Sequence, residues 1–225
     1  MAIQLRVSLP DRPGALALVA AAIADAGADV VSVAVLEAEA GRAIDDFRLR
    51  WPDARDASPL LDALTRYDGV TVLGCRRTPW PHDGRPDLDL LAALMSAPER
   101  GVETLVDMAP AAFDADWAEL RAPSRHLARL YGTTPDAHDE AAPDVMPIRG
   151  LTWLVDKQAW VWLPMPTIKC VLVLGRDTGP GFLRSELDDA ERVVKLATGL
   201  LIGVLTARDS HGEPTDLTAH LAAAR

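Results

Sequence analysis

Runs of positive charge and long apolar stretches are both missing from this chain of 225 residues. Its 33 acidic residues outnumber its 23 basic ones, for a formal charge of −10, and no lysine- or arginine-rich run could track a phosphate backbone. No apolar run is long enough to span a membrane, and the start lacks the pattern of a signal peptide. We therefore expect a cytoplasmic protein that binds neither nucleic acid nor membranes.

Residues that carry common chemistry are scarce as well. The two cysteines, Cys75 and Cys170, lie far apart in apolar contexts typical of strands, so we expect buried thiols rather than a redox pair. The five histidines show no metal-ligand spacing and no nucleophile motif. Asp45 and Asp46 should point to opposite sides of a strand, so they form no acid–base couple. The sequence predicts no metal, no cofactor and no catalysis; an enzyme with an unrecognised site in the second half is a less favoured alternative.

The chain opens with a strand, a polar turn and a helix. Apolar residues alternate from Ile3 to Leu9, as in a half-buried strand. In the turn that follows, Asp11 is a good N-cap and Pro13 suits the first helical turn, where its missing N–H costs nothing. Apolar residues then recur at helical spacing until Gly27, which ends the helix.

Three strands and a second helix complete this first part. Strands at 30–37 and 43–51, joined through Ala40-Gly41, predict a hairpin. A helix that starts at Ser58 and a last strand at 70–75 complete the order βαββαβ, with both helices on one side of the sheet.

The remaining sequence predicts a separate domain. The segment "RTPWPHDGRPD" has three prolines, polar residues and no periodicity, which is typical of a linker. Beyond it we expect a helical region broken near Pro98, mostly antiparallel strands, and a long helix from about Ser185. The predicted divisions are a first domain at 1–77, a linker at 78–87, a second domain at 88–210 and a loose tail at 211–225.

The opening turn has a composition suited to binding an amino acid. Helix N-termini present unpaired amides and the positive end of the helix dipole, so the amides of Gly14, Ala15 and Leu16 could hold a carboxylate. The Asp11 side chain could then take the ligand's ammonium group. The alternative is that Asp11 only caps the helix and no ligand binds.

The first 77 residues contain "LPDRPGAL" at the turn, "AGADV" at the helix end and the hairpin after it. With these three features, they resemble an ACT domain, a regulatory module of amino-acid-metabolising enzymes. The resemblance implies a ferredoxin-like fold and an amino-acid site between two subunits. The site residues that it implies are those of the turn and of the segment after the helix glycine: Asp11, Arg12, Pro13, Gly14, Ala15, Leu16, Ala28, Asp29 and Val30. Serine-binding relatives typically have asparagines where this chain has Asp11 and Asp29, which leaves the choice of ligand open.

The segment "VVSVAVLEA" predicts a partner. In a βαββαβ sheet this strand lies at an edge, yet it carries no proline or lysine, and we expect Val31, Val33 and Val35 on one face and Val30, Ala34 and Leu36 on the other. Unprotected edges pair with other strands. We therefore expect a homodimer with a continuous sheet.

The stretch from Cys170, "CVLVLGRDTGPGFLRSELDDAERVVKLATGLLIGV", resembles the end of a GAF domain, which implies a second ligand-binding or dimerisation module. Its glycine-rich part lacks the Gly-Lys-Ser/Thr ending of a phosphate-binding loop, so we interpret it as a turn. Trp153, Trp160 and Trp162 could line a pocket for a flat ligand, although core or interface packing is the simpler interpretation. The whole sequence thus indicates an α+β chain: an ACT domain followed by a GAF-like α/β domain with a mostly antiparallel sheet.

These observations favour a non-catalytic small-molecule sensor, in which binding of an amino acid shifts a conformational equilibrium. The alternative is a regulatory subunit that docks on an enzyme of amino-acid metabolism. Co-purification of a partner protein would separate the two.

Overall fold

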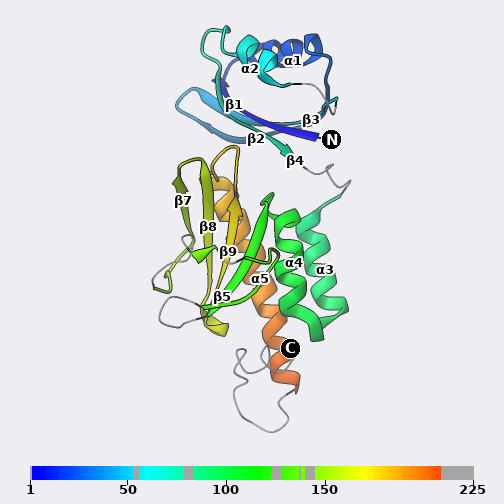
Figure 1. The fold of residues 1–225 in the computed structure, drawn as a ribbon, viewed down its shortest axis with the longest axis vertical. Coiled ribbons are helices and arrows are strands. Elements are labelled where there is room, and N and C mark those ends of the chain that lie inside the picture. The colour runs from blue at the N-terminus through cyan, green and yellow to red at the C-terminus, as the bar shows by residue number, and fades with distance from the viewer. Residues whose placement is uncertain are drawn as a thin grey trace. The chain divides into compact units, whose positions relative to one another are not determined.

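The structure is a computed structural model that describes residues 2–52, 56–78, 84–122, 128–136, 138–139 and 145–208. The chain divides into two compact units, Met1–Asp83 with Thr178–Pro180, and Gly84–Asp177 with Gly181–Arg225. Each unit has its own antiparallel sheet and its own hydrophobic core (Figure 1).

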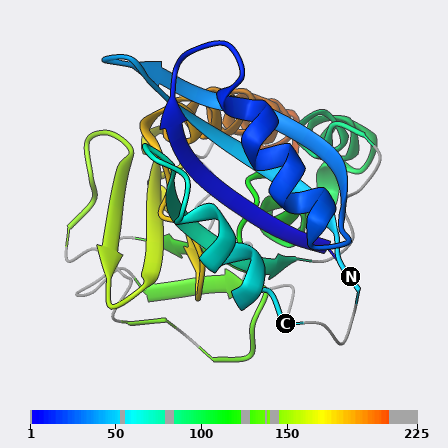
Figure 2. The same ribbon diagram turned by 90° about the horizontal axis from the view of Figure 1, so that it is seen from above.

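The first unit has the predicted order βαββαβ. Its elements are β1 (Ala2–Pro10), α1 (Ala15–Asp25), β2 (Asp29–Glu39), β3 (Arg42–Arg50), α2 (Ser58–Leu64) and β4 (Thr71–Thr78). The strands form one sheet in the order β2-β3-β1-β4, and β2 is therefore an edge strand, as predicted. Figure 2 shows α1 and α2 side by side over the sheet.

Apolar and polar residues alternate along β1, so one face of the strand is apolar and the other is polar. Ile3, Leu5, Val7 and Leu9 belong to the core that α1 and α2 cover. The intervening positions carry a polar network on the other face: Arg6 pairs with Asp46 at 2.7 Å, and Gln4 donates to Asp46 at 2.8 Å. One strand thus serves an apolar and a polar layer, as period-two patterning requires.

The hairpin between β2 and β3 turns at Ala40-Gly41, as the sequence predicts. Both residues have positive φ, 52° and 76°, which is the backbone of a type I′ turn and matches the twist of the flanking strands. This turn brings Glu39 opposite Arg42 and fixes the register of the pair.

The second unit is a five-stranded antiparallel sheet with helices. Its elements are α3 (Pro86–Ser96), a 3-10 turn (Pro98–Arg100), α4 (Gly101–Ala112), β5 (Trp117–Ala122), β6 (Ala128–Gly132), β7 (Leu151–Val155), β8 (Gln158–Met165), a 3-10 turn (Pro166–Ile168), β9 (Cys170–Arg176) and α5 (Arg184–Arg208). The strand order is β6-β5-β9-β8-β7. Side chains of α3, α4 and α5 form one core with β5, β8 and β9, and the predicted break at Pro98 is confirmed.

The structure differs from the predicted linker at both of its ends. The predicted linker at 78–87 is shorter, because Thr78 still belongs to β4 and α3 begins at Pro86, where proline fits the first helical position. Part of the linker, 79–83, and the tail after Arg208 lie outside the described residues.

The sequence analysis missed β7. It pairs with β8 through a turn at Asp156-Lys157, whose φ values of 49° and 79° also match a two-residue primed turn. This turn contains no glycine or asparagine that would mark it in the sequence.

In the described part of the chain, no helix is both long and apolar enough to cross a membrane.

Candidate functional site

The candidate site begins at the turn between β1 and α1. The Asp11 amide donates to the Gly41 carbonyl at 2.9 Å, and the Arg12 amide donates to the Pro10 carbonyl at 2.9 Å. These bonds tie the turn to the end of β1 and to the β2–β3 hairpin, so its backbone is held in place before α1 begins.

The structure corrects the predicted cap of α1. The N-cap is Gly14, in a left-handed conformation at φ 90°, and no side chain bonds to the helix N-terminus there. Asp11 is therefore not the cap, and Pro13 precedes the helix rather than lying in its first turn. Glycine takes this conformation without the penalty that a Cβ would bring. As a consequence, the exposed Asp11 carboxylate is not used to cap the helix.

Part of the predicted carboxylate cradle remains open. The Ala15 amide donates to the Arg12 carbonyl at 3.2 Å, so it is already engaged, whereas the amides of Gly14 and Leu16 lie where a helix has no intrahelical acceptors. A Cβ built on Gly14 would meet nothing within 4 Å. The turn thus leaves room for a ligand to approach the backbone.

Asp45 is a candidate site residue that the sequence analysis missed. It lies in β3 opposite Val7, on the face that the helices cover, and only 2% of it is exposed. Its Oδ1 has no hydrogen-bond partner. Burial, and then the charges of Asp11 and Asp46, raise the pKa of this carboxyl. An acid among the inward positions Ala43, Phe47 and Leu49 was the signal that could have identified it.

Within one chain, the structure does not bring the two predicted halves of the site together. Asp11 follows Pro10, which pairs with Arg42, whereas Asp29 pairs with Arg50 at the other end of β3. The eight steps from Arg42 to Arg50 along β3, at about 3.4 Å each, place these ends roughly 27 Å apart. Ala28 and Val30 lie beside Asp29, so this half of the predicted site is remote from the turn.

The edge strand β2 is exposed and apolar. Val30, Val31, Val33 and Val35 are all exposed, and Val35 is 63% exposed. One detail of the predicted faces is wrong: the register shifts between Val30 and Ser32, so Val30 pairs with Leu49 and shares the helix-side face with Val33 and Val35. A bulge of this kind inserts one unpaired residue and reverses the alternation beyond it.

The second unit places aromatic and charged groups on the sheet face opposite its helices. Trp160 is buried, as packing predicts, and Trp162 stacks with Trp153 at a centroid distance of 6.0 Å. The His138 ring stacks on Trp117 at 3.7 Å, and its Nδ1 lies 2.9 Å from the Glu119 carboxylate.

Neither cysteine lies in a disulfide. Cys170 is buried as predicted, whereas Cys75 is only half-buried; burial raises the pKa of the Cys75 thiol. Among the described residues, no cluster of three or more metal-ligating side chains could hold an ion.

Comparison with known proteins identifies the first unit. The family model of the ACT domain matches residues 3–69, which contain the turn, α1 and the β2–β3 hairpin. These residues are an ACT domain. No family model identifies the second unit, and no curated protein matches the chain.

Two solved structures share distant similarity with the chain. One is a formyltetrahydrofolate deformylase from Pseudomonas putida KT2440, with 15% identity and a TM-score of 0.28; the match covers 43% of this chain and 38% of the deformylase. The other is an unknown protein from Galdieria sulphuraria, with 12% identity and a TM-score of 0.32, covering 90% of this chain and 92% of that one. These similarities support no conclusion on fold or function.

Proposed function

We propose that this chain is a non-catalytic regulatory protein of the cytoplasm, whose ACT domain binds an amino acid between two copies of the chain. The ligand carboxylate lies at the amides of Gly14 and Leu16, and the ammonium group lies near Asp11 and Asp45. Asp29 of the second copy completes the site.

The observation that carries this proposal is the separation of Asp11 from Asp29 along the sheet. If two β2 strands pair antiparallel about a twofold axis, Asp29 of one copy lies near Glu39 of the other. Glu39 pairs with Arg42, beside Gly41, whose carbonyl accepts the Asp11 amide. Pairing of the two edges therefore unites the two halves of the site that a single chain keeps apart.

Two further observations support the same assignment. The exposed valines of β2 are the surface that such pairing would cover. The Asp45 carboxyl is buried without a partner at Oδ1, and an ammonium group would supply the missing donor. The exposed valines and the unpartnered Asp45 oxygen both destabilise a free monomer. In a liganded dimer, strand pairing would cover the valines and the ligand would supply the missing donor.

We propose that the second unit is a GAF-like module for a second ligand or for dimerisation. Its five-stranded antiparallel sheet with helices on one face is compatible with that assignment. A regulatory subunit that docks on another enzyme would use the same ACT site, and co-purification of that enzyme would distinguish it.

The test is a thermal-shift screen of the full chain against the twenty amino acids, followed by calorimetric titration of any that binds. A ligand at about 100 times its Kd stabilises the folded state by roughly 2.7 kcal/mol. We expect Asp11→Asn to weaken binding about tenfold with little change in Tm, because Asp11 is not a helix cap.

The matched control is Asp25→Asn, which removes one exposed acid from the other end of α1. Gly14→Val should also block the ligand, although its positive φ adds a folding cost. If no amino acid stabilises the chain, or if Asp11→Asn and Asp25→Asn bind equally well, the proposed site is wrong.

A further inference from the structure

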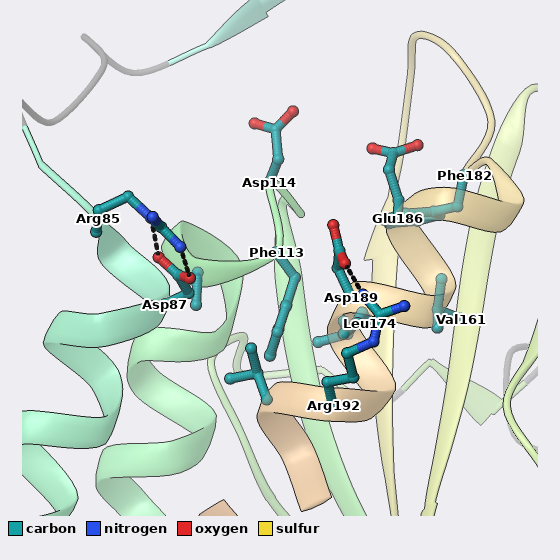
Figure 3. Close-up of a pocket in the computed structure, with 13 residues that line it drawn as sticks. Arg85, Asp87, Phe113, Asp114, Val161, Leu174, Phe182, Glu186, Asp189 and Arg192 are labelled. Atoms are coloured by element: carbon teal, nitrogen blue, oxygen red, sulfur yellow. Dashed lines mark hydrogen bonds and ion pairs between the residues drawn. The ribbon is translucent and has the colours of Figure 1, made fainter. Parts of the chain in front are cut away.

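A cavity of about 420 Å³ lies in the second unit, between the start of α3, the turn after α4 and the first turns of α5 (Figure 3). Its floor is apolar and belongs to the core: Val161 of β8, Leu174 of β9 and Ala190 of α5 are all buried. Small-molecule sites are typically clefts of roughly 300–1,000 Å³ with predominantly apolar walls. The size and the floor of this cavity therefore suit a small organic molecule.

Two aromatic rings add to the apolar lining. Phe113 follows the end of α4, and Phe182 precedes the start of α5. The guanidinium of the fully buried Arg176 lies 3.8 Å from the centroid of the Phe182 ring, which fixes the orientation of that ring before any ligand binds. Aromatic rings pack well against other aromatic rings in offset-stacked or edge-to-face arrangements. The lining therefore favours a ligand that carries an aromatic ring.

Four of the charged side chains that line the cavity form two ion pairs. Arg85 pairs with Asp87 at 2.8 Å, and Arg192 pairs with Asp189. The Asp87 hydrogen bond, and less strongly the charge of Asp189, raise the pKa of the Arg85 guanidinium, so the two pairs lie near each other. Both arginines are more than two-thirds exposed, so these pairs lie at the mouth of the cavity and face solvent.

The other two acids that line the cavity are engaged within the protein as well. Glu186 Oε1 lies 2.7 Å from Arg176 Nη2, and Glu186 Oε2 accepts the Leu183 amide at 2.8 Å. Asp114 Oδ2 lies 3.6 Å from the same Arg176 nitrogen. Each charged side chain of the lining thus has a partner in this chain. A charged ligand group would have to displace one of these partners or be buried without one, and both are unfavourable.

We propose that this cavity binds a small uncharged aromatic molecule. The ring of the ligand packs on the apolar floor beside Phe113 and Phe182, and any hydroxyl or N–H group that it carries points toward the solvated ion pairs at the mouth. Cations and anions both bind less well, because each charged side chain of the lining is already engaged. This assignment gives the second unit a ligand class, and it does not depend on the amino-acid site of the ACT domain.

The test is calorimetric titration of the full chain with three probes that share an indole ring. We expect indole itself, which is uncharged, to bind. Tryptamine, a cation, and indole-3-acetate, an anion, should each bind at least tenfold more weakly, since their charged groups find only side chains that are already paired.

Two variants test the cavity itself. Val193→Phe should fill the space and abolish indole binding; the matched control is Leu196→Phe, at an exposed position of α5 outside the lining. Phe113→Leu keeps the wall apolar but removes a ring, so it should weaken indole binding roughly threefold to tenfold. Far-UV circular dichroism checks that each variant folds, and Phe113→Leu serves as the test if Val193→Phe does not.

Three results would overturn this assignment: no binding of indole at millimolar concentration, equally tight binding of either charged probe, or indole binding that both cavity variants leave unchanged. Asp11→Asn should leave indole binding intact, so a failure of this site and a failure of the ACT-domain site give different results. Loss of indole binding in Asp11→Asn would place indole in the ACT domain and would equally overturn the assignment.

Discussion

One buried side chain of this protein lowers the stability of the fold, which suggests that it has a functional role. Asp45 sits among inward-facing residues of β3 with an unpartnered oxygen, although a leucine or valine would pack there without penalty. Proteins commonly retain such costs where function depends on them. Stability and ligand binding should therefore respond in opposite directions when this carboxylate is removed.

The first prediction concerns Asp45→Asn. The raised pKa means that folded chain binds a proton at Asp45 more readily than unfolded chain, so stability falls as pH rises from 3.8 through the folded pKa. Removing the charge should add about 1 kcal/mol at neutral pH, and this gain should shrink as the pH is lowered toward 3.8. Urea unfolding across this range measures it, and titration should show weaker ligand binding.

Asp46→Asn is the contrasting neighbour. It breaks the ion pair with the buried Arg6 at 2.7 Å, so it should lower the free energy of unfolding at neutral pH. A gain in stability from both variants, or from neither, would show that burial of the Asp45 charge is not the cause.

The second prediction compares two glycines of the second unit. In β9, a Cβ on Gly175 would collide with the Trp117 indole, whereas a Cβ on Gly199 in α5 would meet nothing within 4 Å. Gly175→Ala should therefore destabilise the unit by roughly 1–3 kcal/mol, and Gly199→Ala should stabilise it by roughly 0.5–1 kcal/mol. Thermal unfolding of both variants checks the opposite signs.

At the scale of elements, the edge strand β2 is the most consequential. It exposes a row of valines and has no proline or lysine to prevent pairing with another strand. The third prediction is that the unchanged chain sediments as a dimer and that Ala34→Lys, in the middle of β2, gives monomers, because lysine blocks edge pairing. Analytical ultracentrifugation measures this, with Ala21→Lys on the exposed side of α1 as the control. An unchanged dimer would rule out this interface.

The sequence predicted most elements of both units because their signals are local. Alternation marked β1, and Ala40-Gly41 marked the hairpin. What it could not show depended on contacts or unusual backbone: the bulge in β2 that reverses the valine faces, and the turn at Asp156-Lys157 that hides β7. The burial of Asp45 depends on the register of three strands, and that register is a property of the folded sheet.

The candidate site was predictable only in part for the same reason. Its residues could be named from the ACT-like turn, but the cap assigned to Asp11 was wrong, since a left-handed glycine starts α1 instead. The separation of its halves, roughly 27 Å, follows from β2–β3 pairing, which no local pattern encodes.

At the scale of the whole molecule, the two units should behave as separate domains. The fourth prediction is that limited trypsin digestion cuts first near Arg85, in the proline-rich segment between β4 and α3. Two stable fragments, residues 1–85 and 86–225, of about 85 and 140 residues, should accumulate. Mass spectrometry identifies the cut, and resistance of this segment would argue for one fused domain.

The opposite placement of Asp11 and Asp29 has a genetic consequence. In the proposed twofold pair, each site takes Asp11 from one copy and Asp29 from the other, so a chain that lacks either residue forms only weakened sites with itself. Mixing Asp11→Asn chains with Asp29→Asn chains creates heterodimers with one site doubly damaged and one intact. The two variants should therefore complement each other, with one site of native affinity in each mixed dimer.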